Sequence, residues 1–412
     1  MSDIEVRPIT DDELADYLRC IGTAFLFGRE VTDEFLEFSR QEFGDLSRRF
    51  AAFVAGSLCG TAGTFGTQLT VPGARTVDCA AVTAVTVLPT HRRRGLLAAM
   101  MRTQLQDAVD RGELAAMLIA AEWPIYGRYG YGMAVEAAGV VVDAQIATFR
   151  EPDLMGSVEI VEQQTFFELA PGIFDRHRVT SPGAITRSTR KWRELIDLDP
   201  RPGAKSPAGR IRVIHRDPSG EADGYAVYDP TEKWEHNRPQ VRLQVIEMIT
   251  ATPTAWLDLW RYLCAVDWVG EVRAAVRAVD DDLRFHLVDG RAARQADRND
   301  HMWVRLLDAR GALAARAYEV PVHTVLEVRD PYLERGGRFV LDADASGAEC
   351  TPTDREPDVS VDIDVLGGAY LGGVSVLPYA LAGRIEEHTP GALAALDHAM
   401  RTTHAPWATT GF

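Results

Sequence analysis

The chain has 412 residues, a length that predicts about two or three domains, each large enough to bury its own core. Hydrophobic residues make up 46% and charged residues 25% of the chain, proportions that are typical of a globular protein and exclude extensive disorder. The net charge is −16, which disfavours nucleic acids and anionic membranes as partners. It favours small cationic partners, although acidic chains also gain solubility from their charge alone.

The five cysteines are far apart and odd in number. They show no Cys-x-x-Cys pair and no Cys and His residues at the spacing of metal ligands. We therefore expect no disulfide framework, no zinc site and no other metal. Residues Met1 to Glu5 lack the basic and apolar regions of a signal peptide. No apolar run is long enough to span a bilayer, so a cytoplasmic protein without a membrane span is expected.

The first part of the chain predicts a mixed sheet with helices in the order β-α-α-β-β-β-α-β. Thr10 followed by Glu13 is typical of a helix start, and Gly56-Ser57 indicates a hairpin. The helix over 32–43 is either packed on the core or a lid over an acceptor site. The predicted strands are 5–9, 50–55, 58–71, 78–88 and 115–121, and the predicted helices are 10–22, 32–43 and 95–111.

The stretch from Val85 to Leu97 predicts a phosphate-binding turn. An apolar strand stops at Pro89, and three arginines lead through Gly95 into a segment of helical periodicity. Free backbone N–H groups and the positive end of the helix dipole can hold a pyrophosphate there, and glycine lets the backbone approach closely. A DNA-contacting patch is the competing interpretation, which the net charge disfavours.

The middle of the chain repeats the strand-then-helix arrangement at 241–250 and 254–266, but the junction Ala251–Ala255 has no glycine and no arginine. We therefore expect no phosphate site there. Trp256, Trp260 and Leu263 are expected to form the core face of this helix. The remaining predicted strands are 211–216, 224–228, 302–307, 322–328, 338–341 and 359–364, and the remaining helices are 165–177, one from about 375, and 391–401.

The Arg-x-x-Gly spacing that follows the strand resembles the acyl-coenzyme A loop of GNAT-superfamily N-acetyltransferases. The run 85–97, together with Tyr126-Gly127-Arg128-Tyr129-Gly130-Tyr131-Gly132, resembles the Eis (enhanced intracellular survival) family. The similarity continues through 324–328, 350–354 and 364–372, and so covers nearly the whole chain.

This resemblance implies an α+β protein of tandem GNAT folds, the second degenerate, followed by a sterol carrier protein-like domain. The expected ranges are 1–150 for the acetyl-CoA-binding domain, 151–296 for the second copy, and 297–412 for the third domain, whose tail would enter the active site.

Acetyl transfer to an amine needs a deprotonated amine, a stabilised oxyanion and a proton for the departing thiolate. Tyr126 matches the family's proton donor, and an ordinary phenol pKa near 10 is comparable to a thiol pKa near 8.5. A core tyrosine in a Gly-rich turn is the structural alternative. The resemblance assigns the general base to the terminal carboxylate of Phe412, whose ordinary pKa of about 3.3–3.7 requires desolvation. A frayed tail is the alternative for any terminus.

The resemblance also implies acetyl-CoA as co-substrate. The backbone of Val85, Thr86 and Val87 would meet the pantetheine arm as an added strand would, and Ala121 and Glu122 would face the same arm. The expected phosphate-binding residues are Arg92, Arg93, Arg94, Gly95, Leu96, Leu97 and Ala98.

The expected reaction is direct transfer of acetyl to primary amines of aminoglycosides or of lysine side chains, by a homohexamer. Gly411 and the apolar run Phe25–Phe27 stand where family members that act on aminoglycosides can carry acidic residues, which leaves the acceptor range open. Two alternatives are an acyltransferase that uses longer acyl-CoA, and a non-catalytic scaffold that binds acyl-CoA and holds an apolar molecule in its third domain.

Overall fold

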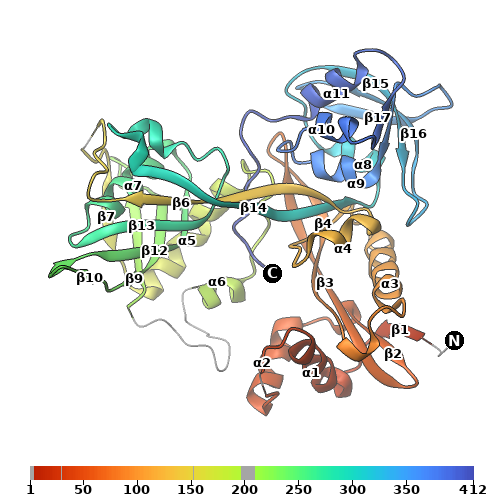
Figure 1. The fold of residues 1–412 in the computed structure, drawn as a ribbon, viewed down its shortest axis with the longest axis horizontal. Coiled ribbons are helices and arrows are strands. Elements are labelled where there is room, and N and C mark those ends of the chain that lie inside the picture. Colours follow the sequence, from red (N-terminus) through yellow and green to blue (C-terminus); the bar gives the residue numbers. More distant parts are fainter. Residues whose placement is uncertain (1–3, 29, 152, 196–208) are drawn as a thin grey trace. The chain divides into compact units, whose positions relative to one another are not determined.

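The computed structural model describes residues 4–28, 30–151, 153–195 and 209–412 (Figure 1). The expectation for the start of the chain falls partly on Met1 to Asp3, outside these residues. The chain divides into two compact units: unit 1 comprises 1–135, 301–403 and 411–412, and unit 2 comprises 136–300 and 404–410. Within the described ranges, no helix is long and apolar enough to cross a bilayer.

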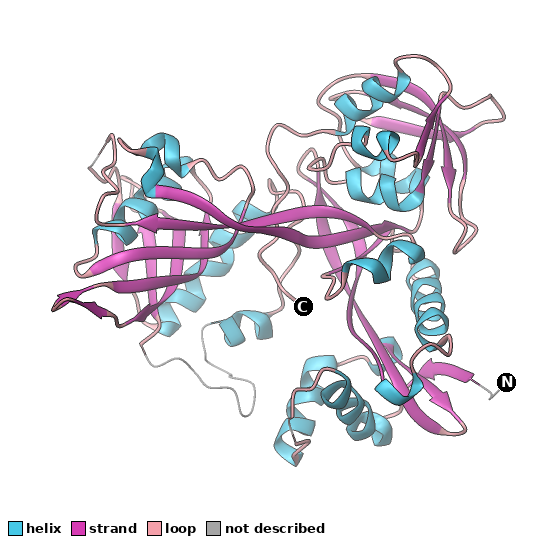
Figure 2. Cartoon of the chain, viewed as in Figure 1, coloured by secondary structure: helices cyan, strands magenta, loops and turns pink. Residues whose placement is uncertain are grey.

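The first GNAT fold lies in unit 1 and has the predicted element order (Figures 1 and 2). Its strands are ordered β1-β2-β3-β4-β5, with β14 beside β5. Among the described pairings of these strands, only β4–β5 is parallel, as a strand-helix-strand unit requires. The elements are β1 (Ile4–Pro8), α1 (Leu14–Ala24), α2 (Asp33–Phe43), β2 (Arg49–Val54), β3 (Ser57–Val71), β4 (Arg75–Val87), α3 (Leu96–Asp110), β5 (Ala115–Leu118), α4 (Trp123–Tyr126) and β14 (Ala293–Leu306).

Helices cover both faces of this sheet because successive strand residues point to opposite sides. On β2, Ala51 and Phe53 pack with α1, whereas Ala52 and Val54 pack with α3. The helix α2 lies on the α1 side, packed on the core. The strand predicted over 115–121 stops at Leu118, where the ladder with β14 also ends.

Unit 2 contains the second copy of the fold. Its strands are ordered β6-β13-β12-β9-β8-β7, and again only the pair before and after the long helix, β12–β13, is parallel. The strands β6 and β14 contribute residues to both units. The elements are β6 (Gly132–Asp143), β7 (Ser157–Ile160), α5 (Gln163–Arg178), α6 (Thr189–Leu195), β8 (Ile211–Arg216), β9 (Ala222–Thr231), β10 (Trp234–Glu235), β11 (Arg238–Pro239), β12 (Val241–Thr250), α7 (Pro253–Ala265) and β13 (Val269–Arg277).

The two helices of this copy lie on opposite faces of its sheet. On β8, Val213 packs with α7 and the next residue, Ile214, packs with α5. The predicted core face of α7 is confirmed, because Trp260 and Leu263 are fully buried and Trp256 is partly buried beside them.

The third region belongs to unit 1 and is an α+β fold, with a five-stranded sheet ordered β17-β16-β15-β18-β19. The strand predicted over 359–364 ends at Asp362, and the chain turns directly into a helix. The elements are α8 (Ala309–Ala315), β15 (Val322–Arg329), β16 (Gly337–Ala343), β17 (Ala348–Pro352), β18 (Val359–Asp362), α9 (Ile363–Ala369), α10 (Leu377–Leu381), β19 (Ile385–Glu387) and α11 (Ala392–Met400).

The third region packs directly against the glycine-rich segment that follows Tyr126. A Cβ on Gly132 would overlap the main-chain oxygen of Asp364 at the start of α9. A Cβ on Gly130 would overlap the guanidinium of Arg305, which is fully buried and donates to Asp330 at 2.6 Å. Gly130 and Gly132 are therefore required by close packing against Arg305 and the start of α9.

We expect Gly132→Ala to lower the free energy of unfolding by about 3 kcal/mol, because neither backbone can move aside without disturbing a packed core. Chemical denaturation of the variant measures this loss. Gly172→Ala is the control: it lies inside α5 with open space around it, so it should leave stability unchanged or raise it by up to about 1 kcal/mol. Equal stability of the Gly132 variant and the wild type would contradict the close-packing explanation.

Candidate active site

The strand β4 carries a bulge at Ala84 and Val85, which together oppose the single residue Ala62 of β3. Ala84 has a φ of 53°, a conformation that non-glycine residues rarely adopt. The Thr61 hydroxyl lies 2.7 Å from the carbonyl oxygen of Ala84 and 2.7 Å from the hydroxyl of Thr86. Thr61 therefore holds the bulge, which bends β4 at this point.

Beyond the bulge, β4 has left its parallel neighbour. The pairing with β5 runs from Cys79–Ala115 to Ala81–Met117, whereas β4 continues to Val87. In the described part of the chain, β5 supplies no partner along this last stretch. The expected pantetheine-binding residues, Val85, Thr86 and Val87, all lie here, on a strand edge that an extended ligand could pair with.

The helix α3 begins without a cap of its own. Gly95 is the N-cap residue, with a φ of 86° and no side chain to bond the first turn. The first N–H groups of a helix have no intrahelical acceptor, so those of Leu96, Leu97 and Ala98 are open. The side chain of Leu96 is buried in the core, and this residue can offer only its backbone.

The three arginines before Gly95 are exposed, and none of Arg92, Arg93 and Arg94 has a carboxylate partner among the residues that the structure describes. Their charge adds to that of the helix dipole at the same point. Uncapped N–H groups beside exposed guanidinium groups form a site suited to a pyrophosphate.

The corresponding junction of the second copy is closed by the protein itself. The Thr252 hydroxyl caps α7 by accepting from the Ala255 N–H at 3.1 Å, and Pro253 removes another donor. The splayed end of β12 is also filled, since Arg277 donates to the carbonyl oxygen of Met248 at 2.9 Å. This geometry fits the expectation that the second copy holds no phosphate.

Tyr126 ends the short helix α4 and is buried. It belongs to the same hydrophobic cluster as Val85, Leu97 and Ala98, so the structure brings the expected proton donor together with both parts of the expected cofactor site. Burial, and secondarily the charge of Glu122, raises the pKa of Tyr126 to about 12. The phenol is therefore a weaker acid than its ordinary value suggests, and it stays protonated over the physiological range.

Ala121 and Glu122 are exposed and lie beyond the end of β5 rather than on it. Glu122 is the N-cap residue of α4, and Pro124 follows in the first turn. A proline in the first turn favours a helix start over a longer strand, which helps to explain why β5 is shorter than predicted.

The C-terminal residue lies against the first GNAT sheet. The Phe412 ring is 5.6 Å from the ring of Phe65 on β3, which pairs with Ala81, the last β4 residue that pairs with β5. The next residue, Val82, belongs to the cluster on the α3 side, so Phe65 faces the other side of the sheet. Tyr126 lies on the α3 side and Phe412 on the opposite side, at the level where the sheet opens.

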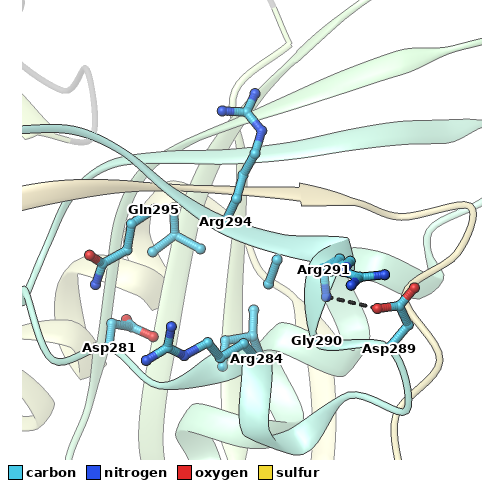
Figure 3. Close-up of a pocket in the computed structure, with 10 residues that line it drawn as sticks. Asp281, Arg284, Asp289, Gly290, Arg291, Arg294 and Gln295 are labelled. Atoms are coloured by element: carbon cyan, nitrogen blue, oxygen red, sulfur yellow. Dashed lines mark hydrogen bonds between the residues drawn. The ribbon is translucent and has the colours of Figure 1, made fainter.

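The structure also contains cavities away from these residues. One of about 660 Å³ lies in unit 2, between β14 and the segment 281–291 (Figure 3). In Figure 3, Arg284 extends toward Asp281, whereas Arg294 points away and Arg291 lies beside Asp289, so the arginines do not converge. None of the predicted site residues lines this cavity.

A second cavity, of about 720 Å³, lies in unit 1 between the turn Gly127–Gly130 and the third region. In its wall, Arg329, Arg338 and Arg384 are paired with carboxylates, whereas Arg128 donates to the Pro124 oxygen. The cavity adjoins the segment after Tyr126 but does not include the uncapped start of α3.

Comparisons with known proteins place this geometry in a class. Residues 5–134 and 183–310 each match an acetyltransferase (GNAT) domain model, and 309–409 match a sterol carrier protein domain model. The predicted fold class is thereby confirmed, while the exact borders at 150/151 and 296/297 stay predictions. The class is that of GNAT acetyltransferases.

Whole-chain relatives narrow the assignment. An uncharacterized N-acetyltransferase of Streptomyces griseus is 39% identical over 98% of both chains. The N-acetyltransferase Eis of Mycobacterium tuberculosis is 34% identical over 81% of this chain and 80% of the relative. The crystal structure of Eis1 from Mycobacterium abscessus aligns with a TM-score of 0.86 and 31% identity, over 99% of this chain and all of that one. The chain belongs to the Eis family of GNAT N-acetyltransferases.

We expect Thr61→Val to raise the KM for acetyl-CoA severalfold, because it removes the hydroxyl that holds the bulge and with it the strand edge offered to the co-substrate. Steady-state thiol release measures this effect. Thr64→Val on the same strand is the matched control, since the Thr64 hydroxyl is buried without a partner in the described residues. Equal KM values for the two variants would contradict a role of the bulge in binding.

Proposed function

We propose that this enzyme transfers acetyl from acetyl-CoA directly to a primary amine, with Tyr126 as general acid and the Phe412 carboxylate as general base. The observation that carries the proposal is the opening of the sheet beyond Ala81, with a buried phenol on one side and the chain end on the other. An opening between two strands is where groups from opposite faces can act on the same bond.

The residues fit the co-substrate in two places. The edge of β4 at Val85 to Val87 supports binding of the pantetheine amides, and the start of α3 with Arg92 to Arg94 supports binding of the phosphates. Acetyl-CoA, the co-substrate of the class, supplies a thioester whose acetyl group passes to the amine nitrogen. Leu96 to Ala98 would hold the pyrophosphate through their N–H groups.

In this reaction a C–N bond forms and a C–S bond breaks, and one proton moves at each end. The Phe412 carboxylate accepts the proton that leaves the amine nitrogen, and the Tyr126 hydroxyl donates a proton to the departing sulfur. A phenol pKa of about 12 exceeds an ordinary thiol pKa of about 8.5, so donation is favourable only if the sulfur is also desolvated. The apolar cluster around Tyr126 supports such desolvation.

For the acceptor, we propose the primary amines of aminoglycosides or of lysine side chains, which match the acidic charge balance of the chain. Phe25, Leu26 and Phe27 are exposed by 40%, 85% and 64%, which favours acceptors with some apolar surface. Use of a longer acyl-CoA remains the alternative, whereas the non-catalytic scaffold is not supported by the family.

Location and assembly are also proposals. All five cysteines are free thiols, which suits the reducing conditions of the cytoplasm. The homohexamer is proposed from the family resemblance.

We expect Tyr126→Phe to lower kcat by about 100-fold or more, because general acid catalysis is lost. Tyr126 acts in its protonated form and its pKa is raised to about 12, so its contribution should persist through pH 10 and be lost only as the pH rises through about 12. Profiles of kcat against pH for both proteins check this. A decline near pH 9 that is present in the wild type and missing in the variant would contradict the raised pKa.

One alanine appended after Phe412 displaces the carboxylate, and we expect kcat to fall by about 100-fold while the melting temperature stays the same. Thiol release with a panel of amines measures the rate. Phe412→Leu keeps a terminal carboxylate and serves as the control, with a smaller loss expected. If the extended chain works at the wild-type rate, the Phe412 carboxylate is not the base.

A further inference from the structure

The second GNAT copy has the same strand opening as the first, but protein atoms occupy it. On β12 the register with β9 shifts between Val245 and Glu247, so this strand also carries a bulge before its free end. Past the bulge, Arg277 donates to the Met248 oxygen at 2.9 Å, and His177 bonds the Thr250 oxygen at 3.1 Å. These backbone oxygens lie past the bulge of β12, as Thr86 and Val87 lie past the bulge of β4.

The C-terminal tail lies on these same side chains. The Trp407 ring is 4.5 Å from the guanidinium carbon of Arg277 and 5.3 Å from the His177 ring, and only 7% of this residue is exposed. The backbone N–H of Trp407 donates to the carbonyl oxygen of Pro182 at 2.8 Å. Trp407 of the tail is therefore buried at the strand opening of the second copy. The similar opening of the first copy is where the co-substrate would bind.

The next anchor is Arg187, which joins the tail to the bulge of β12. Its guanidinium pairs with Glu247 at 2.9 and 2.5 Å, and donates to the hydroxyls of Thr410 at 2.7 Å and Thr409 at 2.9 Å. The side chains of the pair are only 4% and 5% exposed. The Tyr225 hydroxyl donates to the same carboxylate at 2.6 Å.

Aromatic rings complete this anchor, since the guanidinium carbon of Arg187 lies 4.0 Å from the ring of Phe174 and 4.9 Å from that of Trp192. Each of the three guanidinium nitrogens of Arg187 donates to at least one acceptor, and two aromatic rings lie against the guanidinium group. Planar stacking together with a bidentate carboxylate fixes an arginine in one orientation.

From these contacts we infer that the degenerate copy is the receptor for the chain's own tail, and that Arg187 is the positioning residue of the terminal carboxylate. In this copy, Arg277 and His177 contact Trp407 of the tail, and Arg187 binds Thr409 and Thr410. Only Gly411 and Phe412 follow the clamped Thr410, and two residues span at most about 7 Å, so the carboxylate is confined to a small volume. Confinement of a reacting group raises its effective concentration.

This inference rests on the proposed function for its catalytic consequence, but the clamp itself can be tested without any assay of acetyl transfer. Carboxypeptidase A removes an accessible C-terminal phenylalanine, and mass spectrometry of the intact full-length protein follows the loss of Phe412. In Arg187→Met the rate of this loss should rise at least about tenfold, since a set of hydrogen bonds to a charged group is lost.

Two further variants make the test specific. Thr409→Val with Thr410→Val leaves the buried Arg187–Glu247 pair intact and should also accelerate the loss of Phe412, even if Arg187→Met folds poorly. Arg210→Met is the matched control: Arg210 makes two bonds of 3.0 Å to Asp229 and one of 3.3 Å to the Leu195 oxygen, so its described partners lie in the same unit and outside the tail. Its rate should equal that of the wild type.

The kinetic readout separates a positioning role from a general structural one. Arg187→Met should lower kcat while the KM for acetyl-CoA stays unchanged, and Arg210→Met should change neither. Faster loss of Phe412 at an unchanged kcat would support the clamp and contradict the proposed base. Loss of Phe412 at the wild-type rate in both clamp variants would overturn the inference.

Discussion

The structure depends on one constraint: a strand that leaves its neighbour exposes backbone groups that must find other partners. Both GNAT copies contain such a strand, since β4 and β12 each separate from the parallel strand beside them and carry a bulge just past that point. In the first copy the exposed edge adjoins an uncapped helix and three exposed arginines, and an extended, anionic ligand would satisfy all of these groups. In the second copy Arg277 and His177 satisfy the exposed oxygens, and Thr252 caps the helix. The two copies therefore differ in what provides the missing hydrogen-bond partners: an added ligand would provide them in the first copy, and protein side chains provide them in the second.

The third region affects the same site through close packing. Gly130 and Gly132 permit backbone contact with Arg305 and the start of α9, and this contact fixes the segment that leaves Tyr126. In addition, the Tyr332 hydroxyl donates to the Ala98 oxygen at 2.6 Å, on the first turn of α3. Through these two contacts, the part of the third region before its tail helps to fix the segment after Tyr126 and the first turn of α3, where the co-substrate phosphates are proposed to bind. Changes in its core should reach the active site through these two contacts.

Much of the first fold could be predicted from sequence because its signals are local. Pro89, the arginines and Gly95 lie within a few residues of one another, and their chemistry does not depend on distant partners.

The bulge could not be predicted, because Ala84 is an ordinary strand residue whose positive φ is imposed by Thr61. Nor could the tail clamp, because Arg187 and Thr410 are 223 residues apart in the chain. No strand is predicted over β6, although its run of three valines, Val140 to Val142, has high β-propensity. The predicted strand over 115–121 is too long at its end, because a short helix with Pro124 in its first turn begins at Trp123.

A base at the end of a chain poses a physical problem that a side-chain base does not. A side chain is held by the backbone on both sides, whereas a terminal carboxylate has a neighbour on one side only, and a free tail would spread it over many positions. The chain must therefore be fixed upstream, at a point close enough that few bond rotations remain between it and the carboxylate.

The tail meets this requirement. Trp407 is buried and Arg187 bonds Thr409 and Thr410, which leaves two residues between the last anchor and the carboxylate. The strand end of the second copy offers a place for such an anchor, because backbone oxygens past its bulge need partners. On the proposed function, this copy serves to hold the tail.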